Sequence, residues 1–330
     1  MLVRIKTKIQ IFFNLLVGLH RIKLFVTILA NSIDTDPGID DAVALSFAFF
    51  HPDVDLRLIT TVAGNVSVSK TTANALKLVQ YFGQDVPVAR GCSEPLIKAF
   101  EDCADIHGES GMDGFDFGQI KKDALPIHAV EALRETILAS EKKVTLMPIA
   151  ALTNIALLFK MYPEVKENIA EIILMGGSLA RGNTTTAAEF NIFTDPEAAD
   201  IVFKAGIPLR MIGLDVTSTA VLMKEQIDQI KTLNRAGEMF SKLFSHYRGG
   251  SMKTGLKMHD VCAFAALVKP EIFTFQKTHV AIETGDGPAN GMTVADLKMK
   301  YHQNTNASVA LTVDVTRFRE WFLETLARVK

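Results

Sequence analysis

Residues 34–41 carry four aspartates around a Pro-Gly turn, and this acidic segment limits what the chain can fold into more than any other feature. Carboxylates this close together repel one another unless a cation lies among them, and oxygen ligands favour a hard metal ion. The Pro-Gly pair at 37–38 predicts a sharp turn. Asp40 and Asp41 then fall in the first turn of a helix, where the helix dipole favours negative charge. The alternative is a solvated acidic loop, which the apolar residues on both sides disfavour.

Composition narrows the class of protein and of partner. The chain has 330 residues, 48% of them hydrophobic, and a net charge of −2 from 35 basic and 37 acidic residues. Without a basic stripe interleaved with aromatic residues, no nucleic-acid partner is expected. Its 3 cysteines form no CxxC or Cys/His pattern, so neither a disulfide framework nor a zinc site is expected. These features are typical of a cytoplasmic enzyme in a reducing compartment.

The N-terminal residues differ in composition from the rest of the chain. Residues 1–33 contain no acidic side chain and carry basic residues around two apolar stretches. His20, Arg21 and Lys23 interrupt these stretches before they are long enough to span a bilayer, so no stable membrane insertion is expected. A signal peptide, a presequence and an over-extended gene start all remain open. We expect a peripheral extension at 1–33 and a single domain at 34–330.

Short β-rich runs alternate with helical stretches after residue 33, which is typical of βαβ units. The pattern predicts an α/β fold with an open, mainly parallel sheet flanked by helices. Strands are expected at 56–62, 144–147, 171–175 and 209–212, and helices at 69–82, 153–162, 196–204, 224–233, 237–247 and 261–267. Several of these strands end in polar or glycine residues, so we expect the site at the carboxyl ends of the strands.

Four further segments contribute candidate site residues. His259 and Asp260 place an imidazole beside a carboxylate before a helix, although such a pair is also an ordinary helix start. Asn65 follows a predicted strand and would lie beside the acidic segment if the two strands are neighbours. The segment 183–191 contains Asn183, Glu189 and Asn191, which suit hydrogen bonds to a polyhydroxylated ligand; the alternative is a polar surface loop. The glycine-bounded loop 107–111 could be a mobile lid or a simple turn.

Together these motifs resemble those of the inosine-uridine-preferring nucleoside hydrolases, from about residue 34 to the C-terminus. The similarity is closest to the bacterial branch that accepts purine and pyrimidine ribonucleosides. The motifs that carry it, in chain order, are Asp-Thr-Asp-Pro-Gly-Ile-Asp-Asp-Ala at 34–42, Thr-Val-Ala-Gly-Asn at 61–65, His-Gly-Glu-Ser-Gly at 107–111, Met-Gly-Gly at 175–177, Ala-Glu-Phe-Asn at 188–191 and His-Asp at 259–260.

The resemblance implies hydrolysis of the N-glycosidic bond of ribonucleosides to free base and ribose, in nucleoside salvage. It implies a Ca²⁺ site formed by Asp36, Asp41, Asp260 and the backbone carbonyl of Ile149. Asp36 would also be the general base that takes a proton from a calcium-bound water. Similar enzymes are dimers or tetramers, so a homo-oligomer is expected.

The resemblance also implies how the substrate is held. Asp40 and Asn191 would hold the 2′-hydroxyl, Asp260 the 3′-hydroxyl, and Asn183 with Glu189 the 5′-hydroxyl, while Asn65 would orient the water and the sugar. His259 would lie near the departing base as its general acid, with a pKa near neutrality. The base pocket would include His107, His246 and Tyr247. Tyr247 could equally be an aromatic residue that packs a helix.

The sequence departs from the family pattern at two points. Ala150 and Ala151 stand where relatives usually have glycine, and a Cβ there would disturb the Ile149 carbonyl, and with it calcium affinity, if the turn needs positive φ. The strand that leads into the acidic segment is also more polar than usual, which suggests either a weak strand or altered pairing.

Two other functions fit parts of the pattern. A magnesium phosphatase of the haloacid-dehalogenase type has Asp-x-Asp at a strand end, as at 34–36, but Pro37, Gly38 and the two following aspartates fit it poorly. A non-catalytic nucleoside-binding protein on the same scaffold would be expected to lack Asp36 or His259, and both are present.

Overall fold

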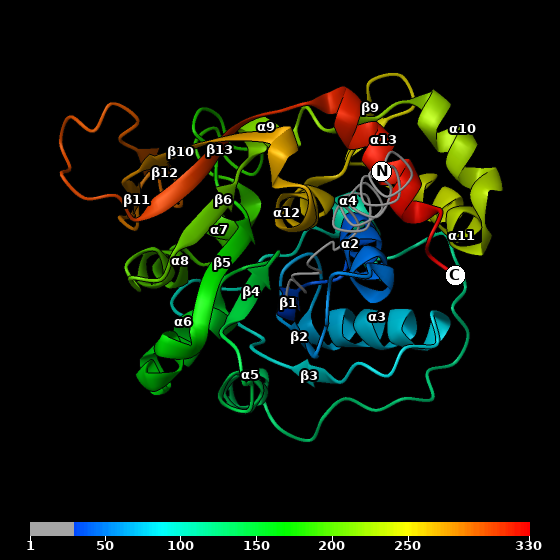
Figure 1. Cartoon of the computed structure of the whole chain (residues 1–330), viewed down its shortest axis with the longest axis horizontal. Helices are drawn as coiled ribbons and strands as arrows, with labels where there is room; N and C mark the ends of the chain where they lie inside the picture. The colour runs from blue at the N-terminus through cyan, green and yellow to red at the C-terminus, as the bar shows by residue number, and fades with distance from the viewer. Residues whose placement is uncertain (1–29) are drawn as a thin grey trace, which may run out of the picture.

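A computed structural model describes residues 30–330 of the chain (Figure 1). The main sheet has eight strands in the order β10-β13-β6-β5-β4-β1-β2-β3. Every neighbouring pair in it is parallel except β10 and β13, so the predicted mainly parallel sheet is confirmed. Its strands are β1 (Ala30–Thr35), β2 (Leu58–Thr61), β3 (Val88–Arg90), β4 (Val144–Pro148), β5 (Ile169–Met175), β6 (Leu209–Ile212), β10 (Phe273–Thr278) and β13 (Ala307–Val313).

Two smaller sheets extend this core. One pairs β11 (Val280–Ile282) with β12 (Thr293–Ala295). The other has the order β7-β9-β8, with β7 (Val221–Leu222), β8 (Gly250–Ser251) and β9 (Gly255–Lys257). The strand β9 leads directly into the helix that begins at His259, so it fixes where that helix starts.

Helices cover both faces of the main sheet (Figure 1). One apolar core lies under α2, α3 and α10 to α13, and a second lies under α5, α6 and α8 on the other face. Their bounds are α2 (Ile39–Phe50), α3 (Val68–Tyr81), α4 (Ala104–His107), α5 (Ala129–Leu138), α6 (Thr153–Met161), η1 (Pro163–Asn168), α7 (Phe190–Thr194), α8 (Pro196–Phe203), α9 (Leu214–Thr217), α10 (Lys224–Leu233), α11 (Arg235–Phe244), α12 (His259–Val268), η2 (Pro270–Ile272) and α13 (Val315–Leu326). Within residues 30–330, no helix is both long and apolar enough to cross a membrane.

The expected elements are present, with small differences at their ends. The helix expected at 237–247 is α11, which ends at Phe244, so Tyr247 lies in the turn after it rather than inside the helix. The polar strand β1 pairs with β2 and with β4, with one irregularity near Ser32, so it is a central strand and not a weak one. It begins at Ala30, four residues before the position expected for the start of the domain, while residues 1–29 lie outside the described part of the chain.

Candidate functional site

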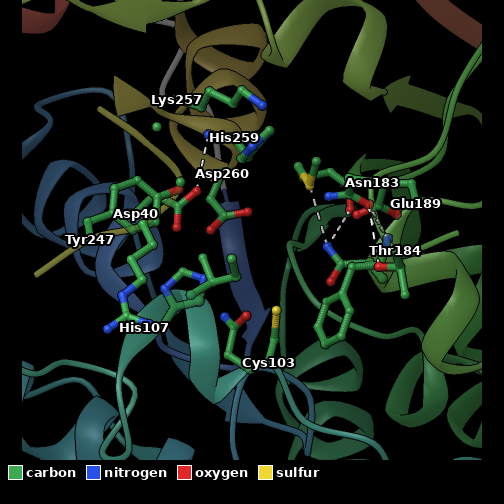
Figure 2. Close-up of a pocket in the computed structure, with 18 of the residues that line it drawn as sticks. Asp40, Cys103, His107, Asn183, Thr184, Glu189, Tyr247, Lys257, His259 and Asp260 are labelled. Atoms are coloured by element: carbon green, nitrogen blue, oxygen red, sulfur yellow. Dashed lines mark hydrogen bonds between the residues drawn. The ribbon is translucent and has the colours of Figure 1, made fainter. Parts of the chain in front are cut away.

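A cavity of about 530 Å³ opens at the carboxyl ends of the central strands (Figure 2). The turn after β1 forms part of its lining, together with the loop after β4 and the segment before α12. Of the site residues expected from the sequence, two do not line this cavity: Asp41 is buried behind its wall, and His246 is exposed outside it. The others do line it: Asp36, Asp40, Asn65, His107, Ile149, Asn183, Glu189, Asn191, Tyr247, His259 and Asp260. The cavity therefore lies at the carboxyl ends of the strands, where the site was expected.

The acidic segment forms a turn that is held by its own side chains. The backbone N–H of Gly38 donates to Asp41 Oδ2 at 2.9 Å, which caps the start of α2. Thr35 Oγ1 donates to the other oxygen, Asp41 Oδ1, at 2.6 Å. Asp41 is thus fixed in place, with no exposed surface. The sequence pattern placed these residues correctly because the turn and the helix start are both local features.

Three carboxylates converge here from opposite ends of the chain. Asp40, Asp41 and Asp260 are buried, and each offers an oxygen within 4.8 Å of those of the others. Burial raises the pKa of each carboxyl, and for Asp40 and Asp260 repulsion from Asp41 adds to it; the pKa of Asp40 reaches about 7. A cluster whose charge is so poorly compensated fits a hard cation bound by oxygen.

Asp36 lies at the end of β1, beside this cluster but outside its closest group. The backbone N–H of Asn65 donates to Asp36 Oδ2 at 2.6 Å, and the Asn65 side chain donates to the Asp36 carbonyl at 3.1 Å. Gly64 packs so tightly against this carboxylate that any Cβ there would overlap it. Burial, followed by repulsion from Asp41, raises the pKa of Asp36 well above its usual value. The carboxyl is therefore rigidly held and has a high affinity for protons.

Asp34 does not join the cluster, although it belongs to the same acidic segment. It does not line the cavity. Its Oδ1 accepts hydrogen bonds from Thr60 Oγ1 at 2.6 Å and from Asn154 Nδ2 at 2.8 Å, which tie β1 to β2 and to α6. Burial raises the pKa of Asp34 to about 7. Asp34 thus stabilises the frame around the site.

The opposite wall of the cavity carries amide and carboxylate groups. Figure 2 shows Asn183 and Glu189 across the cavity from Asp40 and Asp260. Glu189 caps α7, because its Oε2 accepts from the backbone N–H groups of Gly177 at 2.8 Å and Ile192 at 3.1 Å. Burial nevertheless raises its pKa to about 7.

Asn191 connects this wall to the loop after β4. Its Nδ2 donates to the Ile149 carbonyl at 3.3 Å and to the Met175 carbonyl at 3.1 Å. Among the described residues other than glycine, only Met299 has a positive φ, so Ala150 and Ala151 adopt ordinary backbone angles. The condition under which their Cβ atoms would disturb the Ile149 carbonyl is not met.

Two histidines and a tyrosine line a third part of the cavity. The backbone N–H of Ile39 donates to His107 Nδ1 at 3.1 Å, and the His107 ring lies 5.3 Å from the ring of Tyr247. His259 donates its backbone N–H to Asp40 Oδ2 at 3.1 Å. Burial, followed by the charge of Asp40, raises the pKa of the Tyr247 hydroxyl well above its usual value. The Tyr247 hydroxyl therefore stays protonated although it lines a polar cavity.

Two expectations about this region are wrong. Burial lowers the pKa of His107 to about 4, and burial with the nearby charge of Lys257 lowers the pKa of His259 to about 3, so the expected value near neutrality does not hold. His246 does not line the cavity: it is exposed and contacts Ser245 and Lys242. Because α11 ends at Phe244, the following turn directs Tyr247 inward and His246 outward.

Several cavity residues were missed by the sequence interpretation, among them Cys103, Thr184, Arg248, Thr254 and Lys257. They lie in irregular segments or on the short strand β9, where no periodic pattern marks a side chain as facing a site. Lys257 ends β9 and His259 begins α12, so no strand alternation relates the directions of these two side chains. Figure 2 shows Lys257 beside His259.

Comparisons with known proteins agree on one family. A family model described as inosine-uridine preferring nucleoside hydrolase matches residues 32–320. The non-specific ribonucleoside hydrolase RihC of Salmonella typhi is 50% identical over 297 residues, which covers 90% of this chain and 97% of the relative. Among solved structures, a purine-preferring ribonucleoside hydrolase from Gardnerella vaginalis superposes with a TM-score of 0.84 at 32% identity, covering 91% of this chain and 98% of that chain. The plant nucleoside hydrolase PpNRh1 gives 0.83 at 28% identity, with coverages of 92% and 99%.

Proposed function

This chain belongs to the inosine-uridine preferring nucleoside hydrolase family, and we propose that it hydrolyses the N-glycosidic bond of purine and pyrimidine ribonucleosides to free base and ribose. The broad base range is supported by the identity with a non-specific ribonucleoside hydrolase along 90% of the chain. The cellular role we propose is nucleoside salvage by a cytoplasmic homo-oligomer. The phosphatase alternative has no support left, because the family match spans the acidic segment on which it depended.

The main support for this proposal is that two polar walls face each other across the cavity. Three buried carboxylates converge on one side, and amide and carboxylate groups face them from the other. A ribose has hydroxyl groups along one edge and at its 5′ position, so it can meet both walls at once. The third part of the cavity, which His107, His259 and Tyr247 line beside the carboxylates, is then left for the base.

We assign a metal site to Asp36, Asp41, Asp260 and the carbonyl of Ile149. The donors are all oxygens, and the raised pKa values of the three carboxyls indicate negative charge that the protein itself does not compensate. When bound, a Ca²⁺ ion would neutralise this cluster, grip the sugar diol and polarise the attacking water.

Asp36 is the proposed general base. An ionised carboxylate beside the metal site can take a proton from water, and the Asn65 N–H holds one of its oxygens in place. As that proton moves to the carboxylate, the water oxygen forms its bond to the anomeric carbon of the sugar. The glycosidic bond breaks, and its electron pair stays with the base nitrogen.

The remaining polar residues hold the sugar. We place Asp40 and Asn191 at the 2′-hydroxyl, Asp260 at the 3′-hydroxyl, and Asn183 with Glu189 at the 5′-hydroxyl. Asn65 orients the water and the sugar. The sugar becomes positively charged as the base departs, and the surrounding carboxylates stabilise that charge.

His259, His107 and Tyr247 would contact the departing base. With lowered pKa values, both imidazoles are neutral at neutral pH, so each can offer one N–H to the base. His259 is accordingly a hydrogen-bond donor to the leaving group, a weaker form of the general-acid role expected from the sequence.

Release of reducing sugar from inosine and from uridine tests this function directly. We expect both nucleosides to be cleaved, no phosphate to be released from nucleotides, and turnover to stop after treatment with a chelator and to return with Ca²⁺. Nucleoside binding without release of sugar would instead indicate a binding protein. Release of phosphate would revive the phosphatase alternative.

A further inference from the structure

Behind His259 lies a threonine that neither the motifs nor the cavity lining includes. Thr217 Oγ1 lies 2.7 Å from His259 Nδ1, and Thr217 is fully buried. It is the last residue of α9, a short helix that follows β6. The backbone fixes its position, since the N–H of Thr217 donates to the Gly213 carbonyl at 3.1 Å and the N–H of Leu214 donates to the Gly177 carbonyl at 2.9 Å.

The hydrogen-bond inventory indicates which atom donates in this pair. A threonine hydroxyl carries one proton, and a buried hydroxyl that donates to nothing is costly. Among the described residues, His259 Nδ1 is the one partner of the Thr217 hydroxyl. The hydroxyl therefore donates to Nδ1, and the single proton of the neutral imidazole lies on Nε2.

His107, the second histidine of the cavity, is also held in the Nε2–H tautomer, but by a different contact. The group that meets His107 Nδ1 is the backbone N–H of Ile39, which can only donate. His107 must then also carry its proton on Nε2. Both rings line the cavity and use Nδ1 for an anchor in the protein, so each has its N–H on the other edge of the ring.

We propose that Thr217 is a positioning residue that holds His259 in the Nε2–H tautomer, with this N–H directed at the departing base. The inference rests on the proposed function, because it concerns how the leaving group is stabilised. When the glycosidic bond breaks, its electron pair stays on the base, and the Nε2–H donates a hydrogen bond to a ring nitrogen or carbonyl oxygen of that base. In the other tautomer a lone pair would face the base and repel it.

A leaving group that needs no hydrogen-bond donor separates this role from a structural one. In p-nitrophenyl β-ribofuranoside the departing phenolate is stable without help. For Thr217→Val we expect kcat/KM for inosine to fall ~10–100-fold, the usual effect of losing a side chain that orients a functional histidine. Turnover of the nitrophenyl riboside should stay within about twofold of the wild type, because the sugar site and the attacking water are unchanged.

Two variants serve as controls. Thr217→Ser keeps the hydroxyl and should restore inosine turnover. Thr219→Val makes the same substitution two residues later, at an exposed hydroxyl that binds the Val216 carbonyl, and should leave both substrates unaffected. In a His259→Ala background, Thr217→Val should cause no further loss, because the two side chains act as a unit.

Nitrogen NMR of the labelled protein gives a readout that does not depend on activity. His259, assigned by comparison with His259→Ala, should show an unprotonated Nδ1 and a protonated Nε2 in the wild type, and this state should be lost in Thr217→Val.

Equal losses on both substrates, or a protonated Nδ1 in the wild type, would overturn the role of Thr217 while leaving the proposed function intact. A wild-type protein that hydrolyses neither substrate would overturn both.

Discussion

Burial shifts the pKa values on the acidic wall and on the histidine side of the cavity in opposite directions. On the acidic wall, burial and mutual repulsion raise the pKa values of Asp36, Asp40 and Asp260. On the histidine side, burial lowers the pKa values of His107 and His259. Burial drives both sides toward their neutral forms. A bound cation would favour the charged form of the acidic wall, whereas the neutral imidazoles can donate hydrogen bonds without one.

The largest expected effect is on the acidic wall. Asp36→Ala removes the proposed base and should lower kcat for inosine by ~10³-fold or more, near the upper range for a positioned base. Because the attack on the sugar is affected, the nitrophenyl riboside should lose activity equally. Steady-state kinetics with both substrates measure this. Asp228→Asn changes an exposed carboxylate that pairs with Lys224 and is the matched control. Activity retained in Asp36→Ala would rule out its assignment as base.

The buried carboxyl of Glu189, on the wall opposite the acidic wall, and the buried imidazole of His107 should change stability with pH in opposite directions in the metal-free protein. The pKa of Glu189 is raised to about 7, so its contribution to the free energy of unfolding is fully present below about 4.5 and is lost as pH rises through about 7. The loss is on the order of 3 kcal/mol. Glu189→Gln should remove this decline, which urea denaturation between pH 4 and 8 measures. An unchanged slope would mean that the carboxyl is charged in the folded state.

For His107 the sign is reversed. Its pKa is lowered to about 4, so folding disfavours the protonated form, and stability is lost as pH falls from about 6.5 toward 4. His107→Asn keeps an acceptor near the Ile39 N–H and cannot gain the proton. We expect this variant to flatten the acid side of the stability curve and to leave the alkaline side unchanged. A steeper acid decline would contradict the burial of a neutral imidazole.

The smallest effect is expected where the two sides meet. Tyr247 contacts His107 by its ring and Asp40 by its hydroxyl. Tyr247→Phe keeps the ring contact and removes the interaction of the hydroxyl with Asp40, so kcat/KM for nucleosides should fall by only about 3–10-fold, in line with ~1 kcal/mol for one hydrogen bond. Kinetics on inosine and uridine would detect it. A loss as large as that of Asp36→Ala would place Tyr247 in the chemical step.

Sequence was sufficient where the controlling interactions are local. The turn at 37–38, the start of α2 and the parallel sheet follow from turn chemistry and from alternating patterns. Nothing local links Asp40 to His259, which lies 219 residues away, and only the family resemblance brought these two segments together. The strands β10 to β13 were not recognised, because β10 pairs antiparallel with a strand some thirty residues later and alternates poorly in burial.

The assignment of His246 to the base pocket was wrong for the same reason, because no local sequence feature determines where this side chain points. Whether His246 or Tyr247 faces the cavity depends on the residue at which α11 ends, which no residue type marks. The shifted pKa values could not be predicted either, since burial and not residue type sets them. Thr217 escaped notice because its contact joins two separate elements of the fold.

A crystal structure grown with Ca²⁺ and an uncleavable ribonucleoside analogue would test most directly whether a cation completes the acidic wall. We expect one ion bound by oxygens of Asp36, Asp41 and Asp260 and by the Ile149 carbonyl, at about 2.3–2.6 Å as is usual for Ca²⁺–oxygen bonds. The ion should also contact the 2′- and 3′-hydroxyls. An analogue seated in the cavity with no ion between these carboxylates, or with its base directed at Asn183 and Glu189, would contradict this arrangement.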